Sequence, residues 1–410
     1  MIDPYKIRKD FPMYVNKIKM QNHDLVFLDN ASTTFKPYSV IKAVEQYLSY
    51  ETSNSHRGDY DLCYHTDLKI EEARKTIGDF INANPNEIVF TSGASMSLNM
   101  IAYGYGAKFL QKGDEILLTE AEHASNILPW FKVASLTGAI IKYIPLDKEG
   151  RLTLDNAKKT ITSKTKIIAV AQVTNVLGFT VDIKGICKIA HEHNIIVVCD
   201  GAQSVPHMKI DVKDLDVDFL AFSGHKMCGP TGIGCIYGKY DLLDKMDPLL
   251  SGGGMNAKFE MCGDVKYLNP PAKFEAGTLN IEGIYGLKAA VDYINNIGIE
   301  NIHEYERDLR AYAISKFKQI PNILIYNEHA DSGIITFNIK GIFAQDLATY
   351  LNSKGIALRS GQHCAKILVS FLKEVATCRA SLYFYTTKED IDYLVEALKN
   401  GGDFLDAYFA

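Results

Sequence analysis

Two side chains that could do chemistry together, Asp200 and Lys226, each follow a short apolar stretch of the chain. We predict strands over residues 195–199 and 217–222, because both stretches are apolar and bounded by polar turn residues. Ligands of open α/β sheets bind outside the carboxyl ends of the strands, so both turns are expected to open into one crevice. Taken alone, an aspartate after a strand is more often a helix cap, and most lysines are solvated.

The residues around this pair favour a chemical role. The segments DGAQSVPH (200–207) and SGHKMCGPTGIG (223–234) are rich in small residues that let a ligand approach the backbone. Pyridoxal phosphate (PLP) is held by a lysine as a Schiff base, and an acidic residue pairs with its ring nitrogen. The carboxylate and the lysine together therefore predict a PLP site.

A third reactive group, Cys364, follows the polar run RSGQH (359–363), whereas Cys199 and Cys235 lie within apolar runs. A thiol in a polar loop can ionise and act as a nucleophile, while a buried structural thiol stays inert. Arg379 comes a short way further along, and its planar guanidinium suits a carboxylate. A structural salt bridge is the alternative for this arginine.

A phosphate site is predicted in EIVFTSGASMSL (87–98), which has the pattern of a strand, a turn of small residues and a helix. Amides at a helix N-terminus point outward with partial positive charge, and Ala94 and Ser95 lie at that point. Such turns are common, so this signal is weak alone. His123 and Asn175 each follow a predicted strand, and either could equally be a structural turn residue.

The composition is that of an ordinary soluble enzyme. With 410 residues, 47% hydrophobic and 23% charged, the chain can form a large core and a second, smaller domain. A formal net charge of -5 argues against nucleic-acid or membrane-surface binding, and no apolar run approaches a membrane span. The eight cysteines lack metal-type pairing such as CxxC, so we expect no metal site and reduced thiols in a cytoplasmic protein.

Alternation of strands and helices between residues 87 and 238 predicts a mainly parallel sheet. Residues 251–280 are expected to be loop-like, and 281–319 to form two long helices. We predict three parts: a lead-in over 1–24, a large α/β domain over 25–290, and a smaller α+β domain over 291–410 that carries the cysteine loop.

From about Phe27 to Thr387 the sequence resembles the class V aminotransferase family of PLP enzymes and, within it, the cysteine desulfurases. The resemblance rests on SGHK (223–226), SGGGM (251–255), FEAGT (274–278) and RSGQHCA (359–365). It implies the PLP-dependent transferase fold of type I. The short segment between Cys364 and Arg379, with the longer insertion over 251–275, resembles the group II enzymes of the SUF type.

The resemblance also implies roles for individual residues. Lys226 would carry the cofactor and transfer protons, Asp200 would bind the ring nitrogen, Gln203 the ring hydroxyl, and His123 would stack on the ring. The implied phosphate contacts are Ala94, Ser95, Ser223, His225 and, from the second subunit of a homodimer with shared sites, Thr278. The implied substrate contacts are Asn175, Arg359 and Arg379. The family's His-Arg-Gly run (56–58) would lie at the active-site mouth, and Tyr60 stands where desulfurases often have a second histidine.

The expected reaction converts L-cysteine to L-alanine and leaves a persulfide on Cys364. The sulfur would pass to an acceptor protein of the SufE or SufU kind, for iron-sulfur cluster assembly or other sulfur transfer. Three alternatives stay open: selenocysteine lyase, an ordinary class V aminotransferase in which Cys364 is idle, and a non-catalytic scaffold for sulfur transfer.

Overall fold

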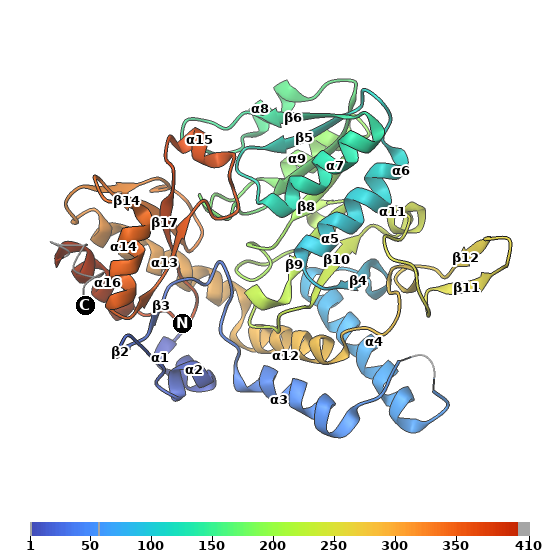
Figure 1. The fold of residues 1–410 in the computed structure, drawn as a ribbon, viewed down its shortest axis with the longest axis horizontal. Coiled ribbons are helices and arrows are strands. Elements are labelled where there is room, and N and C mark those ends of the chain that lie inside the picture. The colour runs from blue at the N-terminus through green and yellow to red at the C-terminus, as the bar shows by residue number, and fades with distance from the viewer. Residues whose placement is uncertain (1, 56–57, 401–410) are drawn as a thin grey trace.

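A computed structural model describes residues 2–55 and 58–400 of the chain. They form a seven-stranded sheet and a four-stranded sheet, each with its own helices (Figure 1). The predicted mouth residues His56 and Arg57 lie outside the described ranges. No helix in these ranges is both long and apolar enough to cross a membrane.

The large sheet has the strand order β4-β10-β9-β8-β7-β5-β6. Every neighbouring pair is parallel except the two that involve β10, so the prediction of a mainly parallel sheet is confirmed. Its strands are β4 (Ile88–Thr91), β5 (Glu115–Thr119), β6 (Ile140–Ile144), β7 (Thr165–Ala171), β8 (Ile196–Asp200), β9 (Phe219–Ser223) and β10 (Gly234–Gly238).

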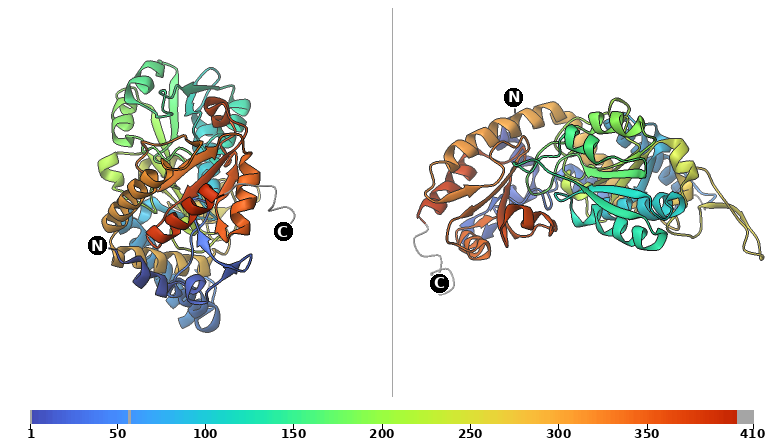
Figure 2. Two further views of the ribbon diagram at one scale, coloured as in Figure 1. Left: turned by 90° about the vertical axis from the view of Figure 1, so that its left-hand side faces the viewer. Right: turned by 90° about the horizontal axis from the view of Figure 1, so that it is seen from above.

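Side chains of the central strands alternate between two hydrophobic cores, one on each face of this sheet. On β9, Leu220 and Phe222 pack into one core, while Phe219 and Ala221 pack into the other. Strands buried on both faces have continuous apolar sequences, which explains the run over 217–222. The first core also contains side chains of α4 (Asp61–Ile81) and α12 (Ile281–Ile297), and the second contains those of α5 (Ala94–Ile101) and α7 (Leu128–Thr137) (Figures 1 and 2).

The helices associated with the large sheet cover both of its faces. They are α3 (Tyr38–Gln46), α4 (Asp61–Ile81), α5 (Ala94–Ile101), α6 (Ala107–Phe109), α7 (Leu128–Thr137), α8 (Leu154–Thr160), α9 (Ile183–His191), α10 (Val212–Leu215), α11 (Tyr240–Lys245) and α12 (Ile281–Ile297). Two long helices were predicted over 281–319, and α12 and α13 (Ile299–Phe317) confirm them.

The second sheet is antiparallel, with the order β13-β14-β17-β16. Its strands are β13 (Ile323–Ile325), β14 (Ile334–Ile339), β16 (Arg359–Gly361) and β17 (Thr377–Ser381), and its core contains side chains of α13, α14 (Ala344–Ser353) and α16 (Lys388–Asn400). The short helix α15 (Leu368–Leu372) instead packs through Leu368 against Val176 and Leu177 in the loop after β7. The predicted division at residues 24/25 and 290/291 is not tested by this arrangement and stays a prediction.

The N-terminal segment contacts the cores of both sheets: Phe11 packs into a core of the large sheet, and Val26 packs into the core of the second sheet. It contains α1 (Pro4–Ile7), α2 (Pro12–Val15), β1 (Lys19–Met20), β2 (His23–Asp24) and β3 (Val26–Phe27). β3 pairs in parallel with β15 (Ile356–Ala357), and Val26 and Leu28 pack into the core of the second sheet. The turn that follows β3 is therefore carried to the junction between the two sheets.

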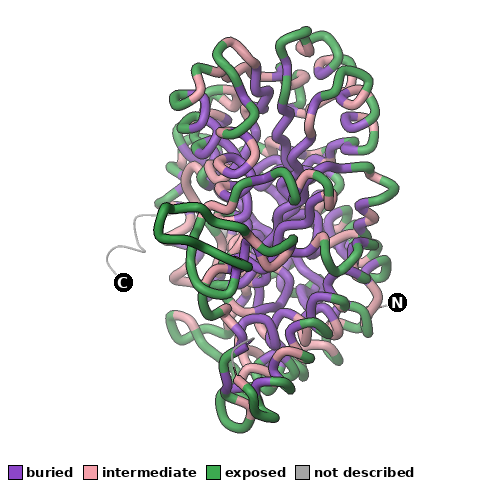
Figure 3. Tube along the Cα trace, turned by 90° about the vertical axis from the view of Figure 1, so that its right-hand side faces the viewer, coloured by how far each residue is buried: buried purple, intermediate pink, exposed green. Residues whose placement is uncertain are grey.

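The loop-like structure predicted for residues 251–280 is only partly correct. This segment contains an antiparallel hairpin of β11 (Asn256–Phe259) and β12 (Val265–Tyr267), which projects from the body (Figures 2 and 3). Most of the hairpin is exposed, including Phe259 and Met261. Because these two strands do not pack on a core, their sequences need no alternation of apolar and polar residues. The sequence therefore offered no indication of strands in this segment.

Candidate active site

The predicted site residues, except Thr278, line a single cavity of about 200 Å³. It lies beyond the carboxyl ends of β7, β8 and β9, where ligands of open α/β sheets bind. The predicted residues that line it are Ala94, Ser95, His123, Asn175, Asp200, Gln203, Ser223, His225, Lys226, Arg359, Cys364 and Arg379. The structure thus brings these residues together; the role of each stays a prediction.

Asp200 and Lys226 enter this cavity from the ends of adjacent parallel strands. The Asp200 carboxylate accepts one hydrogen bond from the backbone amide of Ala202 at 2.9 Å. Within the described residues no hydrogen bond or ion pair reaches the Lys226 amine. Burial lowers the pKa of Lys226 to about 8; the negative charge of Asp200 opposes this shift, and the positive charge of Arg379 adds to it. The amine is therefore available as a base or nucleophile close to neutral pH.

The turn that carries Lys226 is held from behind by the segment that follows β3. The carbonyl oxygen of His225 accepts hydrogen bonds from the Thr34 amide at 3.0 Å and the Thr33 hydroxyl at 3.1 Å. The Lys36 ammonium also reaches it at 3.3 Å. Several donors on one carbonyl fix the backbone next to Lys226, and burial lowers the pKa of the His225 imidazole to about 4.

Hydroxyls and backbone amides gather at the start of α5. The Ala94 amide donates to the Ser223 hydroxyl at 2.8 Å, and the Ser95 and Ser125 hydroxyls are 2.6 Å apart. Gly93 has φ 141°, and a side chain there would place its Cβ 3.3 Å from the Ser223 hydroxyl. This end of the cavity offers the donors that a phosphate group requires.

His123 follows β5 and caps the short turn Ala124–Asn126. Its Nδ1 accepts a hydrogen bond from the Ser125 amide at 3.1 Å, so the ring proton lies on Nε2 in the neutral imidazole. Burial, and then the charge of Lys226, lower the pKa of His123, which keeps the ring neutral.

Two arginines from the second sheet converge on the turn after β3. Arg379 of β17 donates to the Asn175 carbonyl oxygen at 2.7 Å and to the Ser32 hydroxyl at 2.8 Å, and it lies 3.3 Å from an Asp29 oxygen. Arg359 also donates to Ser32, at 2.9 Å. The Arg379 side chain is buried and its Nε has no partner among the described residues, so donor capacity remains for a ligand carboxylate.

Asp29 and Ser32 were not individually predicted. Their only signal was the turn LDNASTT (28–34), which the family resemblance implies to border the substrate site; the sequence could not indicate that this turn would contact both arginines. Gln203 lines the cavity, and its amide nitrogen donates to the Ala31 carbonyl oxygen at 2.8 Å. The implied contact of Gln203 with the ring hydroxyl stays a prediction.

The loop that bears Cys364 has an unusual backbone. His363 and Cys364 have φ angles of 50° and 57°, in the left-handed region that non-glycine residues rarely adopt. The Asn175 side chain donates to the His363 carbonyl oxygen at 2.8 Å, and the Ala124 amide donates to the Cys364 carbonyl oxygen at 2.7 Å. The large sheet therefore holds this loop, with the Cys364 thiol exposed at the cavity.

The residues present fit PLP. At the strand ends lie an amine with no hydrogen-bond partner in the described part of the chain and a carboxylate with bonding capacity to spare, while hydroxyls and amides form the opposite end. A buried lysine that lacks a partner is costly unless a ligand engages it. Lys226 would hold the cofactor aldehyde, Asp200 its ring nitrogen, and the start of α5 its phosphate.

Thr278 does not line this cavity. It is exposed and lies with Ser92, Leu250 and Glu275 around a separate surface pocket of about 190 Å³. This placement leaves it free to contact another molecule, and its implied reach to a second subunit stays a prediction.

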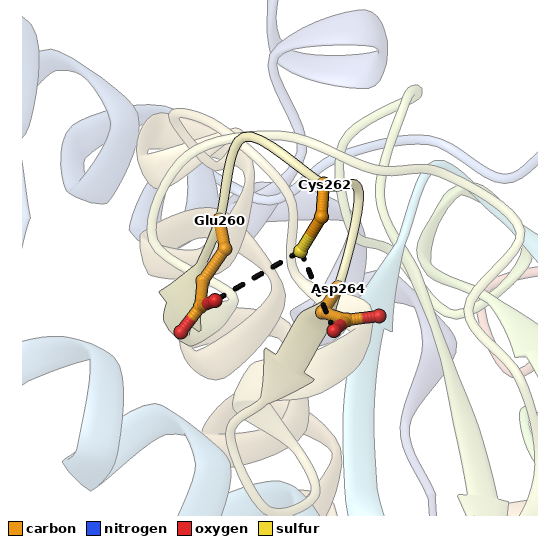
Figure 4. Close-up of side chains that lie close together, drawn as sticks. All are labelled: Glu260, Cys262 and Asp264. Atoms are coloured by element: carbon orange, nitrogen blue, oxygen red, sulfur yellow. Dashed lines mark hydrogen bonds between the residues drawn. The ribbon is translucent and has the colours of Figure 1, made fainter.

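A group of side chains that could bind a metal ion lies outside the cavity. Glu260, Cys262 and Asp264 come together at the tip of the β11–β12 hairpin (Figure 4). The Cys262 thiol lies 3.8 Å from a Glu260 oxygen and 3.4 Å from an Asp264 oxygen. Cys262 and Cys364 are the two exposed cysteines, and the sequence had not distinguished Cys262 from the buried ones.

Comparison with known proteins agrees with this geometry. A profile of the class-V aminotransferases matches residues 26–394. A protein of Halalkalibacterium halodurans named probable cysteine desulfurase is 43% identical over 409 residues, covering 100% of both chains. Crystal structures of the cysteine desulfurase CsdA from Escherichia coli and of a cysteine desulfurase from Thermococcus onnurineus are 37% and 36% identical, with TM-scores of 0.90 and 0.91; each match covers 97% of this chain and 98% of the other.

The fold is that of the type I PLP-dependent enzymes, as the sequence predicted. The chain belongs to the class-V aminotransferase family. Members of this family depend on PLP, which the donor groups of the cavity fit.

Proposed function

We propose that the protein is a cysteine desulfurase that converts L-cysteine to L-alanine and collects the sulfur as a persulfide on Cys364. The observation that carries the proposal is the exposed Cys364 thiol at the cavity of Lys226 and Asp200. An aminotransferase would not need a thiol there. The similar proteins named cysteine desulfurases support this activity.

The residues of the chain divide the chemistry among them. Arg379 binds the substrate carboxylate through its free donor capacity, and Arg359 lies beside it at the more exposed side. Bound PLP supplies an electron sink for the charge that develops at the α-carbon. Lys226, whose pKa is lowered to about 8, takes and returns protons at the α-carbon.

Cys364 then acts as the nucleophile. As thiolate it attacks the substrate sulfur, so a sulfur–sulfur bond forms and the carbon–sulfur bond of the substrate breaks. The electron pair of that bond remains with the three-carbon fragment, which gains protons and leaves as L-alanine. The overall change, a thiol and L-cysteine giving a persulfide and L-alanine, requires no added oxidant.

We further propose that the enzyme is of the SUF type, acts in the cytoplasm, and passes sulfur to an acceptor of the SufE or SufU kind for iron-sulfur cluster assembly. The short segment between Cys364 and Arg379, which contains α15, supports this subtype. We propose a homodimer in which Thr278 reaches the other subunit's cofactor phosphate. The exposed apolar side chains of Leu250, Phe259 and Met261, close to Thr278 in the chain, support an interface there.

The test measures alanine released by the PLP-loaded protein after L-cysteine is added. Cys364→Ser should still bind PLP, but its rate of alanine release should be below that of the wild type. Cys262→Ser, which removes the other exposed thiol, is the matched control and should remain fully active. Equal alanine release by wild type and Cys364→Ser would refute the proposed role of this thiol.

A further inference from the structure

A carboxylic acid that the proposed reaction does not use lies beneath the active site. Glu122 is 1% exposed. Its carboxylate accepts hydrogen bonds from the Thr119 hydroxyl at 2.6 Å, the Asn126 side-chain amide at 2.8 Å and the Ala171 backbone amide at 2.8 Å. These donors come from the end of β5, from the turn after it and from the end of β7, so one side chain joins three segments.

Two of these segments carry groups of the active site. The turn over residues 122–126 contains His123, and its Ala124 amide donates to the Cys364 carbonyl oxygen at 2.7 Å. The backbone amide of Asn126 closes the same turn, because it donates to the His123 carbonyl oxygen at 2.8 Å. Ala171, at the end of β7, lines the cavity and is the register partner of Asp200. Movement of this turn would therefore shift His123 and Cys364 relative to Asp200.

We propose that Glu122 is a positioning residue that anchors the turn over 122–126 to the end of β7 and thereby places His123 and Cys364 for the reaction. The inference rests on the proposed function for what these two residues do. It goes beyond that function in assigning their placement to a buried carboxylate that touches neither substrate nor cofactor.

The chemistry of the pocket around Glu122 supports an anchoring role. All three partners are donors, so an apolar side chain would leave three buried groups unsatisfied. Burying the charged form of this acid is unfavourable, and burial raises the pKa of Glu122 to about 7. The hydrogen bonds from Thr119 and Asn126 oppose this shift, and the negative charge of Asp200 adds to it. A costly acid that accepts hydrogen bonds from three donors and ties the turn over 122–126 to β5 and β7, beside reacting groups, is better explained by placement than by core stability.

Two substitutions separate anchoring from charge. A glutamine oxygen can accept from Asn126 and Ala171 while its nitrogen donates to the Thr119 hydroxyl, so Glu122→Gln keeps the anchor without the charge. Glu122→Ala removes both. Glu115→Ala is the matched control, because Glu115 lies at the other end of β5, is 4% exposed, and binds the Thr162 hydroxyl at 2.6 Å without lining the cavity.

The experiment compares these variants by hydrogen exchange in the apoprotein, and by circular dichroism of the cofactor band and steady-state kinetics in the PLP-loaded protein. For Glu122→Ala we expect exchange of the Ala124 amide to be at least about 10-fold faster than in Glu115→Ala. We expect kcat to fall about 10- to 100-fold with KM for cysteine changed less than about twofold. The dichroism per bound cofactor should also change, because His123 no longer holds its place against the ring.

Glu122→Gln should stay within about threefold of wild type in all these measurements. If Glu122→Ala only loses thermal stability, as Glu115→Ala does, with unchanged exchange and dichroism, the proposal is wrong. It is equally wrong if Glu122→Gln falls as far as Glu122→Ala, since charge would then be the cause. Should Glu122→Ala not fold, Asn126→Ala breaks one bond of the anchor and must show smaller changes in the same direction. Exchange and dichroism do not depend on desulfurase turnover, so they decide the proposal even if the proposed function fails.

Discussion

The ion pair between Arg74 and Glu275 connects α4 to the segment that carries Thr278. Arg74 donates to both oxygens of Glu275, at 2.8 and 2.9 Å, and the two side chains are 2% and 6% exposed. A second acid, Glu71, lies 3.2 Å from the Nε of the same arginine, but its side chain is 57% exposed. The Arg74 guanidinium therefore forms a buried ion pair with Glu275 and an exposed one with Glu71, and the two can be compared directly.

We predict that Glu275→Gln lowers the free energy of unfolding by about 3–5 kcal/mol, because it leaves the buried Arg74 charge with only the exposed carboxylate of Glu71 as counter-charge. The loss is made worse because the Phe90 amide also donates to Glu275, at 2.9 Å, so the new amide nitrogen must face at least one donor. Glu71→Gln should cost about 1 kcal/mol or less, since water screens an exposed pair.

Urea unfolding followed by the fluorescence of Trp130 measures both changes. Trp130 is the single tryptophan of the chain and lies fully buried in a core of the large sheet, so its emission reports that core. The dependence of the free energy on urea should be the same in all three proteins. If the two variants lose the same free energy of unfolding to within about 0.5 kcal/mol, burial does not make the Glu275 contact stronger, and the reasoning is refuted.

Four further predictions concern the reactive groups. Lys226→Ala should lose the visible absorbance of bound cofactor and all alanine release, and comparable turnover in the variant would exclude Lys226. Mixing inactive Lys226→Ala and Thr278→Ala subunits should partly restore activity, because a mixed dimer with shared sites has one site in which both residues are intact. Because the pKa of Lys226 is lowered from 10.5 to about 8, trace acetylation of this amine in the apoprotein should be half-maximal near pH 8, as located by peptide mass spectrometry. After treatment with L-cysteine, the added sulfur should be found on the peptide of Cys364 and not on that of Cys262.

The strand ends that carry Asp200 and Lys226 could be predicted from the sequence. Both strands are buried on both faces, so each is a continuous apolar run whose polar residue marks its end. Because both strands were expected in one parallel sheet, their ends had to meet at one edge. The position of the cavity followed from this rule without any knowledge of tertiary contacts.

Features that depend on distant partners were not accessible in the same way. The stretch over 25–34 has the pattern of a buried strand that runs into a turn; its strand is only Val26–Phe27, and it is paired with β15 more than three hundred residues later. The β11–β12 hairpin has an exposed sequence with no alternation to reveal it. The contacts of Glu122 could not be predicted for a related reason, because its three donors come together only when β5 and β7 lie side by side.

The place of Cys364 shows most clearly what local sequence leaves undetermined. The run RSGQHCA indicates a polar loop with a thiol, and nothing in it favours the left-handed conformation of His363 and Cys364. That conformation costs about 1–3 kcal/mol for each non-glycine residue, so neither would adopt it in isolation. The cost is offset by hydrogen bonds from Asn175 and Ala124, which belong to the loops after β7 and β5. The proposed nucleophile, Cys364, is thus supplied by the second sheet and held in place by the first, so packing the two sheets together is what completes the cavity.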